Sequence, residues 1–289
     1  MVRQRHLTMQ DSTDSTSAAL ASLATSLPPS VKVALADGAD PATKVLIVTL
    51  ARAHKRNALD DVTVLGLAAV FDSLPPAVRA VVLQGEGQHF SAGLDLSELS
   101  ERDVAGGIAH CRLWHRIFQD IEFGQVPVVA VLKGAVIGGG LELACTAHVR
   151  VAEASTFYAL PEGQRGIFVG GGGSVRLPRL IGVSRMMEMI LTGRSHDAQA
   201  GQLMGISHYV VEAGKGLEKG LELARRICTN TATTNFAVLH ALPRIAESDP
   251  AAGYLTESLM AAIAQGDEEA KRRIRDFLAK RAGKVVGPG

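Results

Sequence analysis

Two glutamates in the middle of the chain have the side-chain chemistry needed for proton transfer. Glu142 and Glu162 each stand beside glycine-rich backbone, with glycine runs at 138–140 and 170–173. Acid/base chemistry on a carbonyl compound needs proton carriers of suitable pKa and fixed donors aimed at a developing oxyanion. The layout predicts two carboxylates that face a reaction centre built largely from main-chain amides.

The glycine runs can supply those amides. The run 138–140 follows an expected strand and opens an expected helix, so the N–H of Gly139 can stand free at a helix N-terminus. A second strand-to-helix turn, 90–96, can present the N–H of Leu94. Two such donors would hold a thioester or ester oxygen, and removing one typically costs roughly 10² to 10³ in rate. For either glycine cluster alone, a tight turn with close packing is the alternative.

Each glutamate also has a purely structural interpretation. Glu142 falls in the first turn of the expected helix, where the macrodipole favours a carboxylate, so it could simply stabilise that helix. Glu162 follows Pro161 in a segment with few charges. A partly buried carboxyl there would have a raised pKa suited to carrying a proton near neutrality, and a surface-loop acid is the alternative.

The composition excludes several classes of function. Thirty Lys+Arg stand against twenty-nine Asp+Glu, a net charge of +1, so no global field holds a nucleic acid. Three separated cysteines without a CxxC pair argue against a disulfide framework or a zinc site, and we expect a reducing, cytoplasmic setting. No metal role is assigned to His110 and His115, which are poorly spaced for sharing an ion on one helix face.

Hydropathy predicts no membrane span. The longest apolar runs, 259–264 and 128–132, are far shorter than the roughly eighteen residues that cross a bilayer. Residues 1–29 are rich in Ser, Thr and Ala and carry acidic side chains without an apolar h-region. We expect a poorly ordered leader there rather than a transit peptide.

Strand and helix patterns alternate through the first two thirds of the chain. Strands are expected at 31–35, 44–50, 78–83, 128–132 and 149–152, and helices from 60 or 61 to 74, over 103–121 and from 140. This α/β core is expected to occupy 30–205.

A C-terminal module is expected over 206–289. One strand, 208–211, precedes segments with apolar residues at helical spacing. Helices that cannot bury both faces within one chain commonly do so against a neighbouring subunit, so we expect oligomerisation. The expected helices of this module are 217–227, 234–245, 251–264 and 267–280. Two further helices, 184–191 and 197–204, are expected at the end of the core.

The segments 90–96, 133–144, 160–162 and 170–182 together resemble the crotonase (enoyl-CoA hydratase/isomerase) superfamily. Order, spacing and flanking strands agree across about residues 30–285. The resemblance implies a spiral of ββα repeats with a helical C-terminal trimerisation region, often a hexamer built from two trimers. It also implies an acyl-CoA substrate, with coenzyme A as part of the substrate and no separate cofactor or metal.

The resemblance assigns roles to individual positions. The N–H groups of Leu94 and Gly139 match the oxyanion hole, and Glu142 and Glu162 match the two hydratase glutamates. The segment 51–59 matches the region near the CoA nucleotide and pantetheine. Phe277 and Lys280 match an aromatic/basic pair that reaches the adenosine part, often across a subunit boundary. The expected substrate-binding residues are Ala53, Lys55, Arg56, Ala92, Leu94, Asp95, Leu96, Gly138, Gly139, Trp114, Phe118, Phe277 and Lys280.

Within the superfamily, the retained carboxylates separate activities. Retention of Glu142 disfavours single-bond isomerases and cinnamoyl-type hydratase-lyases, and Gly170 stands where dienoyl isomerases and dehalogenases place an aspartate. The chain departs from the family pattern at Val169, at Gly163 and in its fourth consecutive glycine, and these departures bear on substrate range.

The expected reaction is syn-type hydration of a trans-2-enoyl-CoA. Two amides polarise the thioester carbonyl, one carboxylate takes a proton from water, and the protonated partner, assigned as Glu162, delivers a proton to Cα. The acyl pocket is expected on 103–121, with Trp114, His115 and Phe118 as candidates, although ordinary core packing is the alternative for each.

One related function stays open, and two functions of other classes are disfavoured. An isomerase, or a hydratase specialised for branched or aromatic acyl chains, could use the same glutamates. An RNA-binding or scaffolding protein on the same fold is disfavoured because the three tyrosines are scattered and form no stacking platform. A non-catalytic relative is disfavoured by retention of both acids and both amide-bearing turns.

Overall fold

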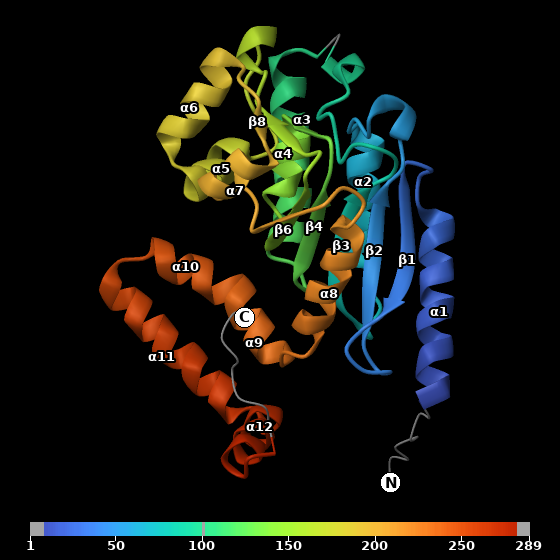
Figure 1. The fold of residues 1–289 in the computed structure, drawn as a ribbon, viewed down its shortest axis with the longest axis vertical. Coiled ribbons are helices and arrows are strands. Elements are labelled where there is room, and N and C mark those ends of the chain that lie inside the picture. Colours follow the sequence, from blue (N-terminus) through green and yellow to red (C-terminus); the bar gives the residue numbers. More distant parts are fainter. Residues whose placement is uncertain (1–8, 100–101, 282–289) are drawn as a thin grey trace. The chain divides into compact units, whose positions relative to one another are not determined.

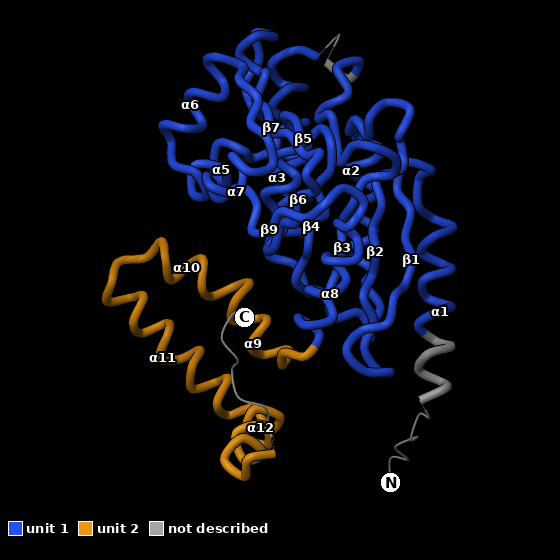
Figure 2. The backbone as a smooth tube through the Cα atoms, in the orientation of Figure 1, with its two compact units in different colours: residues 1–228 blue, residues 229–289 orange. Residues whose placement is uncertain are grey.

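The computed structural model describes residues 9–99 and 102–281 (Figure 1). It divides into two compact units. The first unit ends at Cys228 and the second begins at Thr229 (Figure 2). The boundary expected at 205/206 is therefore too early, because strand β9 (Tyr209–Val211) and helix α8 (Gly216–Cys228) belong to the first unit.

A six-stranded sheet forms the centre of the first unit, in the order β1-β2-β3-β4-β6-β9. Strand β1 pairs antiparallel with β2, and all other neighbours are parallel. All six strands were expected from the sequence, and their ends differ from the expectation by a few residues at most. Their bounds are β1 (Val31–Asp37), β2 (Lys44–Leu50), β3 (Val78–Gly85), β4 (Val128–Leu132), β6 (Val149–Glu153) and β9.

Both faces of this sheet are buried. Along β4, Val128, Ala130 and Leu132 belong to one hydrophobic core, and Val129 and Val131 belong to another. Helices α2 (Asp61–Asp72) and α3 (Val104–Glu122) contribute to the first core, and α8 contributes to the second. Because successive side chains of a strand point to opposite faces, burial of both faces explains why β4 is apolar without alternation.

A second, three-stranded sheet was not expected from the sequence. It consists of β5 (Ala135–Ile137), β7 (Phe157–Ala159) and β8 (His196–Asp197), in the order β5-β7-β8. Strands of three residues or fewer are too short to show a period. This sheet positions the candidate site, because the chain passes from β5 into the turn at Gly138 and from β7 toward Glu162.

Helices α2 and α3 begin at aspartates that cap them. Asp60 and Asp103, at the expected starts of α2 and α3, accept hydrogen bonds from the N–H groups of Thr63 and Gly106. The next helices along the chain are α4 (Gly139–Ala144), α5 (Gly173–Ile181), α6 (Val183–Thr192) and α7 (Ala198–Met204). Of these, α5 was not expected from the sequence. Short 3₁₀ turns are η1 (Ala53–Lys55), η2 (Leu96–Leu99) and η3 (Gly163–Arg165).

The expectation of a poorly ordered leader is wrong for residues 9–26, which form helix α1 (Met9–Ser26). Leu20 packs against the core of the first unit, and Leu23, three residues further on, is also buried. Residues three apart share one helix face, so a short apolar stripe holds the helix. The Ser- and Ala-rich composition concealed this stripe. Residues 1–8 lie outside the described residues.

The second unit is helical, as expected. The single helix expected over 234–245 is divided, because Pro243 has no N–H to continue the α-helical ladder and a π-helical turn, η4 (Ala237–Ala241), precedes it. The helices are α9 (Ala232–Phe236), α10 (Leu242–Glu247), α11 (Pro250–Gly266) and α12 (Glu268–Leu278).

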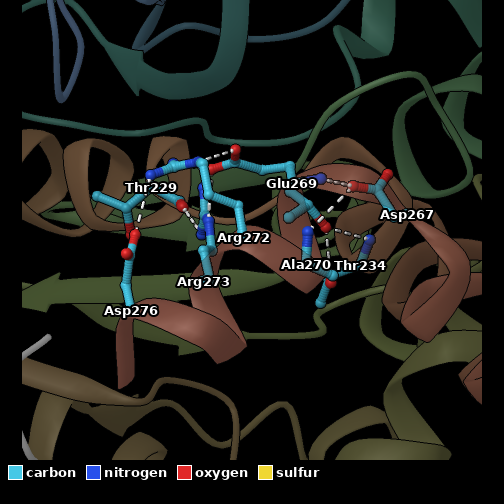
Figure 3. A network of polar contacts seen from close by, with 9 residues as sticks. Thr229, Thr234, Asp267, Glu269, Ala270, Arg272, Arg273 and Asp276 are labelled. Atoms are coloured by element: carbon cyan, nitrogen blue, oxygen red, sulfur yellow. Dashed lines mark hydrogen bonds and ion pairs between the residues drawn. The ribbon is translucent and has the colours of Figure 1, made fainter. Parts of the chain in front are cut away.

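A polar network fixes the start of α12 within this unit (Figure 3). Asp267 accepts hydrogen bonds from the N–H groups of Glu269 and Ala270 and from the Thr233 hydroxyl. Arg273 pairs with Glu269 and donates to the Thr229 carbonyl. The network ties α12 to α9 and to the segment that precedes it. Phe277 lies in the last turn of α12, and Lys280 follows the helix.

Among the described residues, no helix combines the length and the apolar character that a bilayer crossing requires.

The central sheet predicts where a truncation should destabilise the protein. Leu83 in β3 is completely buried. We expect Leu83→Ala to lower the free energy of unfolding by about 2–5 kcal/mol, because it removes buried methyl groups and leaves a cavity. Leu203→Ala in α7, where the side chain is 86% exposed, is the matched control and should change stability by at most about 0.5 kcal/mol. Urea denaturation followed by circular dichroism compares them, and equal losses would contradict this description of the core.

Candidate active site

One cavity of the first unit brings the two glutamates and both glycine turns together. Ala92, Leu94, Leu96, Trp114, Gly138, Gly139, Glu142 and Glu162 all line it. Strands β5 and β7 pair in parallel with Ile137 opposite Ala159, and the Gly138 N–H donates to the Ala159 carbonyl over 3.0 Å. The pairing of two very short strands therefore carries both glutamates to the same place. Their catalytic role stays a prediction.

The N–H of Leu94 is left without a partner by the local backbone pairing. Leu59 lies opposite Leu94 in a parallel β-bridge, but its backbone bonds to the residues on either side of Leu94. The Leu59 N–H donates to the Gly93 carbonyl, and the Leu59 carbonyl accepts from the Asp95 N–H. Ser91 fixes the turn, because its hydroxyl donates to Asn57 O and accepts from Gly93 N. Leu94 N donates to no other described residue.

The N–H of Gly139 also has no acceptor among the described residues, for a different reason. Gly139 is the first residue of α4, where backbone N–H groups have no partner within the helix, and the cap residue Gly138 has no side chain to accept one. The two turns touch. Gly93 has φ +87°, and a Cβ built there would lie 3.1 Å from Gly139 N and 2.5 Å from Ile137 O. Only glycine fits this contact, which holds the two free amides next to each other.

Glu142 is a buried carboxylate with backbone donors. Its side chain is 4% exposed, and Oε1 accepts hydrogen bonds from Gly171 N at 2.9 Å and Gly173 N at 2.7 Å. Gly173 begins α5, so this second donor is a helix N-terminus. Burial raises the pKa of Glu142, while the Gly173 and Gly171 amides and the Arg176 charge oppose the rise.

Glu162 is also buried, but one of its oxygens has no donor. The side chain is 6% exposed, and Oε2 has no hydrogen-bond partner among the described residues. Burial raises the pKa of Glu162 to about 7, and the neighbouring Glu142 carboxylate adds to the rise. A Cβ built on Gly138 would lie 2.6 Å from Glu162 Oε1, so this carboxyl lies directly over the turn that precedes Gly139.

Burial raises the pKa of both glutamates, but their hydrogen-bond donors differ. Hydrogen bonds donated to a carboxylate favour its ionised form, whereas burial without donors favours the neutral acid. Glu142 is therefore suited to accept a proton and Glu162 to donate one. Two titratable groups whose surroundings separate their pKa values are typical of an acid/base pair.

One wall of the cavity comes from α3. Trp114 is buried and its ring contacts the Gly139 turn, since Cζ3 lies 3.1 Å from the Cβ position of Gly139. Its indole N–H donates to Asp61 Oδ1 over 2.8 Å, and the His110 ring lies against Trp114 with centroids 5.0 Å apart. Trp114 thus has both proposed roles, core packing and cavity lining. His115 is exposed and does not line the cavity.

An open groove adjoins the cavity and shares Ala92, Leu94, Leu96 and Arg165 with it. His54, Lys55, Arg56, Ala58 and Asp95 complete its lining. Asp95 accepts ion pairs from Arg52 at 2.9 Å and Lys55 at 2.8 Å, and the bond from Lys55 is the main reason that the pKa of Asp95 is strongly lowered. A basic groove that opens from the cavity suits a phosphate-bearing carrier.

Four of the expected binding residues are not part of these walls. Phe118 is fully buried in the core and lies behind the glycine run, with Cε2 3.1 Å from the Cβ position of Gly171, so its expected contact with the acyl group is not supported. Ala53 is exposed in η1 beside the groove but does not line it. Phe277, 55% exposed, and Lys280 belong to the second unit, and their contact with coenzyme A stays a prediction.

Other lining residues were missed at the sequence level. His110 and Cys111 lie on the same helix face as Trp114, so helical spacing could have indicated them. Arg165, Ile167, Phe168 and Val169 follow Glu162 in an irregular segment whose path no periodicity predicts.

Comparisons with known proteins agree with this geometry. Residues 41–285 match the enoyl-CoA hydratase/isomerase family. The chain is 32% identical to the 2,3-dehydroadipyl-CoA hydratase of Escherichia coli, covering 84% of this chain and 96% of that protein. It is 30% identical to the short-chain-enoyl-CoA hydratase of Clostridium acetobutylicum, covering 82% of this chain and 92% of that protein.

Solved structures are similar over most of the chain. A protein of Rhodopseudomonas palustris, provisionally assigned as an enoyl-CoA hydratase, is 56% identical with a TM-score of 0.84 and covers 88% of this chain and 97% of its own. An enoyl-CoA hydratase of Bacillus anthracis is 27% identical with a TM-score of 0.81, covering 88% and 98%. The chain therefore belongs to the enoyl-CoA hydratase/isomerase family, and the expected crotonase-type fold is confirmed. Enzymes of this family act on acyl-CoA substrates.

The environment of Glu162 predicts a titration near neutral pH. Because its pKa is about 7, the side chain should be mostly a neutral acid at pH 6 and mostly ionised at pH 8. Infrared difference spectra between these pH values should show loss of a carboxylic acid C=O band on raising the pH. Glu162→Gln should remove the Glu162 contribution and weaken this difference band, and Glu86→Gln, a change at an exposed surface acid, should leave it unchanged. A band of undiminished strength in Glu162→Gln would contradict the assignment.

Proposed function

We propose that the protein hydrates a trans-2-enoyl-CoA to a 3-hydroxyacyl-CoA. The observation that carries this proposal is the sharing of one cavity by two buried glutamates of contrasting environment and two free backbone amides. Membership of the enoyl-CoA hydratase/isomerase family supports it, as do the relatives named as hydratases. No step of this chemistry requires a metal or redox cofactor, and the absence of one remains a prediction.

The amides act on the thioester carbonyl. Leu94 N–H and Gly139 N–H both donate to its oxygen, so the negative charge that develops there as the double bond is attacked is stabilised. Because these donors are fixed by strand pairing and by a helix start, they need no reorganisation during the reaction. Polarisation of the carbonyl makes Cβ of the conjugated system open to attack by water.

The glutamates move the protons. Glu142, whose ionised form is favoured by hydrogen bonds from the Gly171 and Gly173 amides, takes a proton from water as the oxygen bonds to Cβ. Glu162, neutral below a pKa of about 7, gives its proton to Cα as the enolate collapses. The proton taken up by Glu142 and the proton lost by Glu162 balance, and exchange with solvent restores both groups. Activity in the hydration direction should therefore decline as the pH rises through the pKa of Glu162.

Coenzyme A binds along the basic groove in this proposal. Lys55, Arg56 and Arg165 supply positive charge beside the mouth of the cavity, and this places the phosphates outside and the acyl chain inside. Trp114 and Phe168 offer apolar surface to the acyl chain.

Loss of either glutamate should abolish most of the turnover. We expect Glu142→Gln and Glu162→Gln each to lower kcat by about 10² to 10⁴, since each removes one proton carrier while keeping side-chain shape. Binding of a saturated acyl-CoA, measured by calorimetry, should persist. Loss of the conjugated enoyl absorbance measures the rate, and Glu86→Gln serves as control.

The same assay separates the alternatives. Near-wild-type rates in either glutamine variant would refute the roles given to the pair. Preferential conversion of 3-enoyl over 2-enoyl thioesters would favour an isomerase. A panel of short, long, branched and aromatic 2-enoyl-CoAs tests the specialised hydratase, because the two hydratase relatives above are named for different acyl groups.

A homotrimer or a hexamer is part of the proposal. The second unit exposes large apolar side chains, and an apolar groove lies along η4, α10 and α11. Such a surface on a helical unit favours contact with another copy. The exposed apolar residues include Phe236, Val238, Leu242, Tyr254, Leu255, Leu259 and Ile263.

Light scattering tests the assembly. At micromolar concentration, the wild-type mass should equal three or six chains. We expect Val238→Asp combined with Leu242→Asp to lower the mass toward one chain, because charges placed on this groove oppose its burial. Leu203→Asp, an exposed position of α7 in the first unit, controls for an added surface charge. A wild-type monomer would contradict the proposal.

A further inference from the structure

A buried arginine lies behind the glycine run that binds Glu142. Arg176 of α5 is 6% exposed, although arginine is rarely buried without partners. Its Nε donates to Glu122 Oε2 over 2.6 Å, and its Nη1 donates to the carbonyl of Gly171 over 3.0 Å. The guanidinium thus bridges the last residue of α3 to the backbone of the glycine run.

Gly171 is bonded through both of its polar groups. Its carbonyl accepts from Arg176, and its N–H donates to Glu142 Oε1 over 2.9 Å. The contacts therefore form a continuous chain from Glu122 through Arg176 and Gly171 to Glu142. Arg176 itself does not line the cavity, so it acts on Glu142 through the backbone and through its charge.

The glycine run is shaped to accept the guanidinium. Gly172 has φ +93°, a conformation that favours glycine, and a Cβ built there would lie 2.3 Å from Arg176 Nη1. A side chain at 172 would displace the arginine. Backbone conformation and arginine placement are consequently coupled at this position.

We propose that Arg176 is a positioning residue, which bridges Glu122 and the Gly171 carbonyl to hold the glycine run in the conformation that binds the Glu142 carboxylate. This inference deepens the proposed function and rests on it for the role of Glu142 as base. A fixed second layer of hydrogen bonds commonly orients catalytic groups in this way.

Several charged or titratable groups surround Glu142. Glu162 and Arg165 follow β7, Cys145 ends its own helix, Glu122 and His110 belong to α3, and Arg176 comes from α5. Of these, Arg176 is the cation whose charge opposes the raised pKa of Glu142. Removing Arg176 should raise the pKa of Glu142 further. Because the proposed base must be ionised, the variant enzyme should lose activity at a higher pH than the wild type as the pH is lowered.

The test uses a double variant that is expected to fold. Arg176→Met alone would leave Glu122 unpaired, whereas Arg176→Met with Glu122→Met replaces both charges by apolar side chains, a change that is often tolerated. We expect the acidic limb of the pH profile of kcat/KM to shift to higher pH by about one unit or more, and kcat at pH 6 to fall on the order of tenfold. Circular dichroism and thermal melting confirm folding.

A conservative variant separates charge from geometry. Arg176→Lys keeps the positive charge, but one ammonium group cannot reproduce the planar bridge between two acceptors. Its acidic limb should lie between those of the wild type and the double variant, while its kcat stays below the wild-type value. Arg185→Met, at an exposed arginine of α6, should leave both quantities unchanged.

A readout without turnover distinguishes failure of this inference from failure of the proposed function. In a Glu162→Gln background, infrared difference spectra report the carboxylic acid band of Glu142, and this band should persist to higher pH when Arg176 and Glu122 are replaced. A folded double variant with wild-type titration of Glu142 and a wild-type acidic limb would overturn the role of Arg176. If the wild type hydrates no enoyl-CoA but the titration still moves, the positioning stands and the proposed reaction fails.

Discussion

Two carboxylates buried in one cavity impose the strongest demand on this structure. A carboxylate removed from water must gain donors or become neutral, because an uncompensated buried charge is too costly. Glu142 meets the demand with the amides of Gly171 and Gly173, and Glu162 meets it through a pKa of about 7. Desolvation raises the pKa of both glutamates, and the amide donors to Glu142 make the two groups differ. Such a difference suits one group to accept a proton and the other to donate one.

The backbone around the glutamates is shaped by that demand. Short parallel strands β5 and β7 bring the turn at Gly138 beneath Glu162, and the contact of Gly93 with Gly139 sets two unbonded amides side by side. Glycines recur here because donors, carboxyls and turns approach within distances that a Cβ would block. The large sheet, with both faces covered, supplies the rigid support on which these irregular segments can be held.

The sequence predicted much of this because its strongest signals are long or chemically rare. The apolar strands 44–50 and 128–132 indicated the core, and the glutamates beside glycine runs indicated the site. What it could not predict depends on contacts between distant segments. Strand β7 is too short to show a period, and Phe118 is buried behind the glycine run although Trp114, one helical turn earlier, lines the cavity. An isolated arginine such as Arg176 shows no pattern until the fold brings Glu122 and Gly171 to it.

A crystal structure with a saturated acyl-CoA bound would test the central claim most directly, because the ligand cannot be hydrated. The account predicts the thioester oxygen at about 3 Å from both Leu94 N and Gly139 N, and one water molecule within hydrogen-bond distance of both Glu142 and Glu162. A thioester oxygen that contacts neither amide, or carboxylates that share no water, would contradict it.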